Sequence, residues 1–185
     1  MKKYLIIFSC LIGIVFINDS CKKQNNKRQE VEKYLGKQIQ IPRDSVLILQ
    51  NDSIVPTEKF NFHSNKIKIV SRINDKCHIC VHLLDQWKQE FLKRYKDRPF
   101  QFVFYLYTDN YELFKRKFYY RISGTYPLLI DTTNAFIRAN NLPEMDKRFH
   151  TFLLNKNNEA ILTGNPLLNT KIKRLYKEEI NKRLD

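Results

Sequence analysis

Two cysteines separated by two residues, Cys77 and Cys80, are the side chains of this sequence best suited to chemistry. They stand where a β-branched segment, residues 66–71, is predicted to form a strand that leads into a helix over residues 77–95. Two sulfurs one helical turn apart can close a small disulfide. Unpaired N–H groups at a helix start favour the thiolate of the first cysteine. We therefore predict that Cys77 attacks and that Cys80 resolves the resulting mixed disulfide.

The same spacing is also compatible with half of a zinc site or with a static structural disulfide. A structural zinc site usually needs a second ligand pair, and the sequence contains no second pair of this kind. The position between a strand and a helix therefore favours a redox pair. Two neighbours could tune it: Lys76 adds positive charge, and His78 either stabilises the thiolate or is only an exposed polar residue.

The elements around the cysteines alternate between strand and helix patterns. This alternation predicts an α/β fold, a three-layer α/β/α sandwich with a central mixed sheet and an N-terminal β-hairpin extension. Asp75 is predicted to cap the helix that carries the cysteines. Strands are predicted at 37–42, 45–50, 54–55, 66–71, 100–107, 126–131, 150–155 and 159–162, and helices at 77–95, 110–120 and 169–184.

The first twenty residues have the pattern of a secretory signal peptide, with a basic start, an apolar run at 4–17 and small residues before Cys21. That run would rise only about 21 Å as a helix, whereas a bilayer core is about 30 Å thick. Cys21 stands where a bacterial lipoprotein signal would be cut, so it is predicted to be lipidated; the alternative is an ordinary exposed cysteine. The predicted segments are a signal peptide at 1–20, a lipidated tether at 21–36, a β extension at 37–60 and the main domain at 61–185.

The net charge of +14 raises the question of a nucleic-acid partner. Acidic residues are interleaved with the basic ones through most of the chain, and no zinc-finger spacing or aromatic RNA-binding motif is present. We therefore predict no nucleic-acid partner. The predicted location is the cell envelope, anchored to a membrane by lipid and facing the periplasm or the cell surface, where basic residues also suit anionic headgroups.

Residues 66–184 resemble a TlpA-like member of the thioredoxin superfamily, and the chain is similar to small lipoproteins of this type from Bacteroides. The resemblance is carried by the motif at 77–80, the strand at 126–131, and the residues at 152–158 followed by those at 164–166. It implies a thioredoxin-like domain without a cofactor. It also implies that Cys77 is the nucleophile and Cys80 the resolving thiol. The implied activity is thiol–disulfide exchange with envelope proteins that carry thiols or disulfides, supported by a separate redox partner.

The sequence departs from that family at the loop which normally holds a cis-proline facing the cysteines. Phe149, His150 and Thr151 occupy the aligned positions and are predicted to form the substrate loop. A cysteine pair with a distant histidine also resembles the site of the Sco-type copper chaperones. The alternative is therefore a metal site in which Cys77, Cys80 and His150 bind a copper ion. A third possibility is a catalytically silent lipoprotein in which the cysteines form a structural disulfide.

Overall fold

The computed structural model describes residues 29–44, 46–50, 53–60, 66–122 and 127–184. The predicted signal peptide and Cys21 lie outside these residues, as do Asn51 and Asp52, which stand between the strands predicted at 45–50 and 54–55. The chain divides into two units between Leu35 and Gly36. In the first unit, residues 29–32 form a helical turn. Within the described residues, no helix has both the length and the apolar character needed to cross a membrane.

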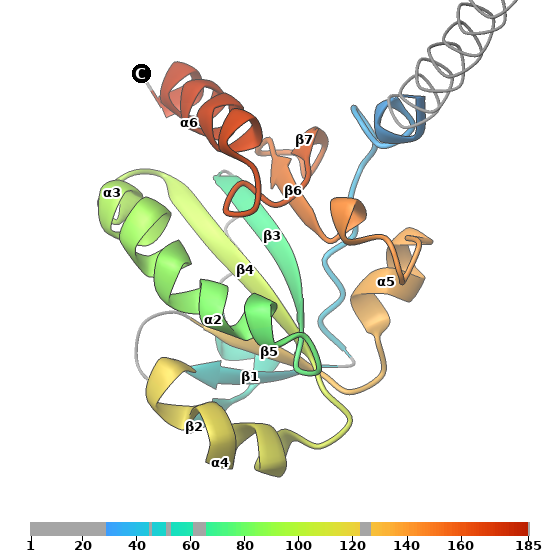
Figure 1. Cartoon of the computed structure of the whole chain (residues 1–185), viewed down its shortest axis with the longest axis vertical. Coiled ribbons are helices and arrows are strands. Elements are labelled where there is room, and N and C mark those ends of the chain that lie inside the picture. Colours follow the sequence, from blue (N-terminus) through green and yellow to red (C-terminus); the bar gives the residue numbers. More distant parts are fainter. Residues whose placement is uncertain (1–28, 45, 51–52, 61–65, 123–126, 185) are drawn as a thin grey trace, which may run out of the picture. The chain divides into compact units, whose positions relative to one another are not determined.

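The second unit is built on one seven-stranded sheet with the strand order β2-β1-β5-β4-β3-β6-β7. β3 pairs in parallel with β4, and β4 with β5, whereas the outer pairs are antiparallel. The predicted mixed sheet is therefore confirmed (Figure 1). The strands are β1 Leu47–Gln50, β2 Ser53–Val55, β3 Ile67–Asn74, β4 Phe100–Tyr107, β5 Leu128–Asp131, β6 Thr151–Leu154 and β7 Ala160–Thr163.

Three long helical regions match the predicted ones. The predicted helix at 77–95 is helical from His78 to Tyr95. Its middle part is a π-helical segment, in which the N–H of Lys93 bonds to the carbonyl of Lys88. Three short elements, η1 (Thr57–Lys59), α5 (Ala135–Asn140) and η3 (Lys147–Phe149), were not predicted, because each is too short to show a helical period. The helices are α2 His78–Trp87, η2 Lys88–Leu92, α3 Lys93–Tyr95, α4 Tyr111–Ile122, α5 Ala135–Asn140 and α6 Thr170–Leu184, with 3₁₀ turns η1 Thr57–Lys59 and η3 Lys147–Phe149.

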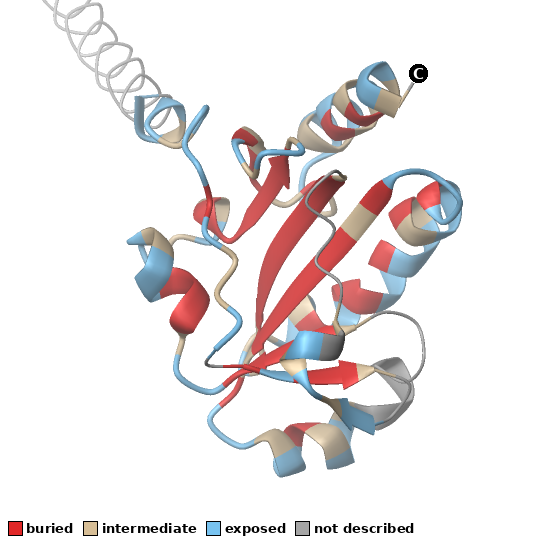
Figure 2. Cartoon of the chain, turned by 180° about the vertical axis from the view of Figure 1, so that it is seen from behind, coloured by how far each residue is buried: buried red, intermediate tan, exposed pale blue. Residues whose placement is uncertain are grey.

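One face of the sheet packs against α2, α3 and α6. Alternate residues of β4, such as Phe102 and Phe104, point to this side and meet Trp87 of α2, whose ring centroid lies 5.6 Å from that of Phe104. Tyr176 of α6 is fully buried in the same cluster. Figure 2 shows the buried residues of the central strands in red. This cluster holds the helix with the cysteines against β3 and β4.

The opposite face packs against α5 and the segment that leads into β1. Tyr105 of β4 stacks on Phe136 of α5 with ring centroids 4.9 Å apart. The hydroxyl of Tyr105 donates a 2.7 Å hydrogen bond to the carbonyl of Pro42, so the incoming segment lies over this face. Helices therefore cover both faces, which confirms the predicted three-layer architecture.

The N-terminal extension differs in part from its prediction. The hairpin is confirmed, since β1 pairs with β2 and also joins the sheet beside β5. The strand predicted at 37–42 is wrong: only Gln38 forms an isolated bridge, with Glu159. Beyond it the backbone leaves the sheet edge, and the N–H and carbonyl of Gln40 bond instead to the side chain of Asn140.

Candidate active site

Cys77 and Cys80 lie at the junction of β3 and α2, as the sequence predicts. Cys77 is the N-cap residue of α2, and its Sγ accepts the backbone N–H of Cys80 at 3.2 Å. The two residues form a disulfide with their Cα atoms 5.2 Å apart. Both are partly buried, while the two residues between them are exposed. The first sulfur therefore stands among the N–H groups that begin the helix, where a thiolate would be stabilised.

Asp75 does not cap this helix, contrary to the prediction. The N-cap residue of this helix is Cys77, whose sulfur accepts the N–H of Cys80. The carboxylate of Asp75 instead accepts a 2.7 Å hydrogen bond from the hydroxyl of Thr108, and its N–H donates to the carbonyl of Tyr107. Asp75 thus ties the loop before the cysteines to the end of β4.

Lys76 and His78 flank Cys77 on the surface. The ammonium of Lys76 is paired with the carboxylate of Asp109, and its side chain is 69% exposed. This hydrogen bond raises the pKa of Lys76 and lowers the pKa of Asp109. His78 is exposed and lines, with Lys76 and Asp109, a cavity of about 440 Å³ between the start of α2 and α4. The redox-tuning roles of Lys76 and His78 stay predictions, and the partner Asp109 was not predicted.

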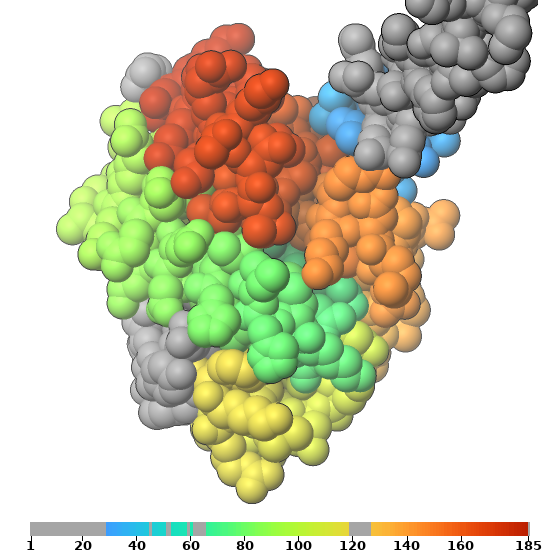
Figure 3. Space-filling model, in the orientation of Figure 1, coloured from blue at the N-terminus to red at the C-terminus, as the bar shows by residue number. Residues whose placement is uncertain are grey.

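A residue that the sequence did not single out contacts the first sulfur. The ammonium of Lys147, the first residue of η3, lies 3.3 Å from Cys77 Sγ, although 70 positions separate the two residues. In the space-filling view, the green atoms of the segment with the cysteines lie beside the orange atoms of the segment before β6 (Figure 3). The basic pair Lys147-Arg148 is visible in the sequence, but the choice of which side chain reaches the sulfur depends on the path of the loop.

The three residues predicted as the substrate loop are buried. Phe149 and His150 are 2% and 7% exposed, and Thr151 is 1% exposed with its hydroxyl bonded to Ser71 at 2.8 Å. Among the described residues every peptide bond is trans. The loop does approach the cysteines, but through Lys147. The substrate role of the three buried residues stays a prediction.

His150 is turned away from solvent and toward a backbone carbonyl. Its Nε2 lies 3.3 Å from the carbonyl oxygen of Pro143. Burial, together with the positive charge of Arg72, lowers the pKa of His150 to about 4. In the described part of the chain, no three His, Cys, Asp or Glu side chains come close enough together to hold a metal ion. The alternative of copper held by Cys77, Cys80 and His150 therefore gains no geometric support.

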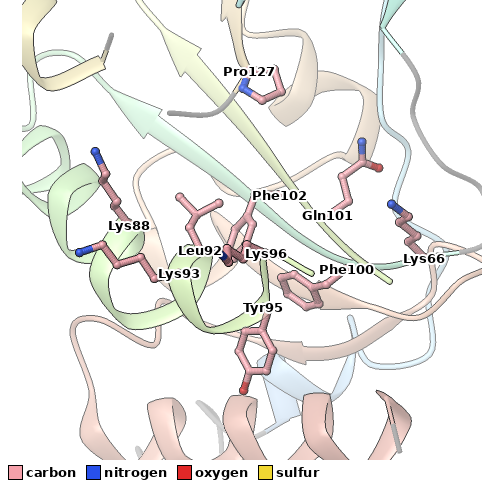
Figure 4. Close-up of a pocket in the computed structure, with 10 residues that line it drawn as sticks. All are labelled: Lys66, Lys88, Leu92, Lys93, Tyr95, Lys96, Phe100, Gln101, Phe102 and Pro127. Carbon is pink, nitrogen blue, oxygen red and sulfur yellow. The ribbon is translucent and has the colours of Figure 1, made fainter. Parts of the chain in front are cut away.

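A second cavity lies at the other end of the parallel strands. Its volume is about 440 Å³, and it opens beside the first residues of β3 and β4, whereas the cysteines follow the last residue of β3. Among the described residues that line it there is no cysteine, histidine or carboxylate, and Figure 4 shows lysine side chains around the aromatic side chains of Tyr95, Phe100 and Phe102. The residues are Lys66, Lys88, Leu92, Lys93, Tyr95, Lys96, Phe100, Gln101, Phe102 and Pro127. The thiol chemistry is therefore assigned to the other end of the sheet.

Comparison with known proteins gives a likeness in structure. No family model matches the sequence, and no curated protein does. The thioredoxin domain of a thiol-disulfide oxidoreductase from Bacteroides vulgatus aligns with a TM-score of 0.56 at 12% identity, covering 76% of this chain and 96% of that one. A thioredoxin-like protein from Porphyromonas gingivalis aligns with a TM-score of 0.54 at 15% identity, covering 80% and 94%.

A 2-Cys peroxiredoxin from Plasmodium vivax aligns about as well, with a TM-score of 0.57, 16% identity and coverage of 81% and 98%. The chain therefore has a thioredoxin-like fold, which confirms the predicted fold class. Because proteins of different chemistry share this fold, the reaction must be argued from the cysteines themselves.

Proposed function

We propose that this chain is a thiol–disulfide oxidoreductase that exchanges disulfides with proteins of the cell envelope. The observation that carries the proposal is the position of Cys77 as the N-cap of α2, with its sulfur bonded to the N–H of Cys80. A structural disulfide does not need a cysteine at the start of a helix, whereas a nucleophilic thiolate is stabilised there. The similarity to solved thiol-disulfide oxidoreductase structures supports the same conclusion at the level of fold.

The reaction follows from two sulfurs one helical turn apart. In the reduced chain, the thiolate of Cys77 attacks a client disulfide, a bond forms between Cys77 and one client sulfur, and the other client sulfur leaves and takes a proton from solvent. The thiolate of Cys80 then attacks Cys77 Sγ, which closes the Cys77–Cys80 disulfide and releases the second client thiol. Two electrons pass to the client, and an envelope thiol donor must reduce the pair again. Run in reverse from the disulfide, the same steps oxidise a client dithiol.

Turnover of a model disulfide tests this function. The full chain, supplied with a thiol reductant, should reduce insulin, and Cys77→Ser and Cys80→Ser should each abolish the turnover. The reduction potential should lie between about −270 and −120 mV, whereas a structural staple would lie below about −300 mV. If the wild type turns over insulin no faster than the double serine variant, the proposed activity is wrong. A catalytically inactive lipoprotein with a structural disulfide would then describe the chain better.

We further propose that the chain is exported and anchored by lipid at Cys21. The support is the sequence alone: a basic start, a short apolar run and a cysteine where a lipoprotein signal is cut. Cys21→Ala should yield an unprocessed or soluble product, which mass spectrometry and membrane fractionation would detect. If the mass of the variant differs from that of the mature wild type only by the sulfur atom that the substitution removes, and the membrane fraction is the same, lipidation at Cys21 is wrong.

A further inference from the structure

The cation that stands at the sulfur of Cys77 comes from the loop before β6. Lys147 Nζ lies 3.3 Å from Cys77 Sγ. This is within the reach of a charge-assisted hydrogen bond to sulfur, and Lys147 is exposed, so its side chain serves no packing role. The sequence neighbour Lys76 directs its charge elsewhere, because its ammonium is held by Asp109.

Nearby carboxylates do not compete for Lys147. The adjacent Asp146 is occupied by Arg148, whose Nε lies 2.9 and 3.0 Å from its two carboxylate oxygens. That hydrogen bonding lowers the pKa of Asp146, so the carboxylate stays ionised and paired. Arg148 thus neutralises the adjacent carboxylate of Asp146, and the ammonium of Lys147 lies at the sulfur of Cys77 instead.

The turn that carries Lys147 is anchored on both sides. Asp146 caps η3 by accepting the N–H of Arg148, and the N–H of His150 bonds to the carbonyl of Lys147. The carbonyl of His150 in turn accepts the N–H of Arg72 at 2.7 Å, which fixes the loop to β3. Since Cys77 follows the same strand, the backbones of the two residues are held at a fixed separation.

From this geometry we propose that Lys147 is a positioning residue that stabilises the thiolate of Cys77 and thereby makes the pair more oxidising. A disulfide sulfur is neutral and gains little from a cation, whereas a thiolate at the same position forms an ion pair. Lys147 therefore stabilises the reduced form relative to the disulfide. In the oxidising direction it also stabilises Cys77 as the leaving thiolate, when the second thiolate of the client attacks the client sulfur bonded to Cys77 and closes the client disulfide.

The test compares Lys147→Gln, which removes the charge, with Lys147→Arg, which keeps it, and with Lys156→Gln, at an exposed lysine in the turn between β6 and β7, as the matched control. The pKa of Cys77 is read in the reduced full chain from the pH dependence of alkylation, with the modified cysteine identified by mass spectrometry. Lys147→Gln should raise that pKa by about one unit. At a pH above both of these pKa values, it should also shift the equilibrium with glutathione about tenfold toward the disulfide, which corresponds to about 30 mV.

Lys147→Arg should keep both values near those of the wild type, and Lys156→Gln should change each less than twofold. The proposal is overturned if Lys147→Gln leaves both values within twofold of wild type, or if Lys156→Gln shifts them equally. The inference rests on the proposed exchange function, but the pKa is measured without any client. A chain without turnover can still show the change in the pKa of Cys77, and an active chain can lack that change. Failure of the exchange function and failure of the Lys147 proposal are therefore distinguishable.

Discussion

Ser71 of β3 and Thr151 of β6 share a buried hydrogen bond of 2.8 Å between their hydroxyls, although 80 positions separate them in the sequence. Ser71→Ala and Thr151→Val should each reduce the free energy of unfolding by about 1–3 kcal/mol, because each change leaves the other hydroxyl buried without its partner. The double variant should lose less than the sum of the single losses, since it leaves neither hydroxyl orphaned.

A double-mutant cycle by urea denaturation measures this coupling. An interaction of at least about 0.5 kcal/mol is expected for groups in direct contact. Additive losses would mean that the hydroxyls do not depend on each other.

The folded protein should lose stability as the pH falls, because of His150. Its folded pKa is lowered to about 4 by burial and by Arg72, while hydrogen bonds to the backbone of Pro143 and Glu144 and the carboxylate of Asp146 act in the opposite direction. The unfolded chain, with a histidine pKa of about 6.5, binds a proton between these two values, but the folded chain does not. Stability due to the neutral imidazole is therefore complete above pH 6.5 and falls by about 3 kcal/mol as the pH drops to 4.

The contribution of His150 is isolated by a difference between variants, because carboxylates titrate in the same range. Free energies of unfolding at pH 7, 5.5 and 4 should fall less steeply for His150→Gln, which can still donate to the carbonyl of Pro143. His82 is exposed and serves as the matched control, so His82→Gln should keep the wild-type slope. Equal slopes for His150→Gln and wild type would show that His150 takes up its proton at an ordinary pH in the folded chain.

Asp131 at the end of β5 should be one of the most sensitive polar residues. It is fully buried, and its carboxylate accepts the N–H groups of Thr133, Ala135 and Phe136 at 2.8–3.2 Å, which caps α5. Asp131→Ala should cost about 3 kcal/mol or more, because those N–H groups lose a charged acceptor inside the protein. Asp131→Asn keeps one acceptor oxygen and should cost less.

Urea denaturation of these variants provides the measurement. The control is Asp97→Ala, since the Asp97 side chain is 83% exposed and its contact with Lys96 is a surface ion pair. That change should cost less than about 1 kcal/mol. A loss for Asp131→Ala no larger than for Asp97→Ala would mean that the cap does not stabilise α5.

The long elements were predictable because their pattern is local. β4 is eight consecutive residues rich in aromatic and β-branched side chains. Such a run predicts a strand, in which Phe102 and Phe104 point to one face and Val103 and Tyr105 to the other. The start of α2 was placed correctly for the same reason, since a strand pattern ends shortly before Cys77. The chemistry of the pair could therefore be expected from the sequence.

The contacts that complete the site could not be predicted, because they depend on how distant segments meet. η3 has only three residues, so no periodicity marks it, and the approach of Lys147 to Cys77 follows from the bond between His150 and Arg72. A local rule favoured Asp75 as the cap, but a tertiary hydrogen bond to Thr108 holds it instead.

The different surroundings of the two sulfurs predict which one traps a client. Cys77 stands at the N-cap beside Lys147, whereas Cys80 lies one turn into α2 and packs against the hydrophobic core. In the full-length Cys80→Ser variant, Cys77 can attack a client disulfide but nothing resolves the product. This variant should therefore accumulate a covalent adduct with insulin chains, visible on non-reducing gels and mapped to Cys77 by mass spectrometry.

Cys77→Ser should form an adduct through Cys80 at least about tenfold more slowly, because Cys80 lacks the cation and the helix-start position that favour a thiolate. Alkylation of the two variants with a small reagent separates nucleophilicity from access, since a small reagent reaches partly buried sulfurs more easily than a protein does. A Cys77→Ser variant that traps insulin faster than Cys80→Ser would reverse the roles of the two cysteines. It would place the attacking thiolate inside the first turn of α2 rather than at its cap.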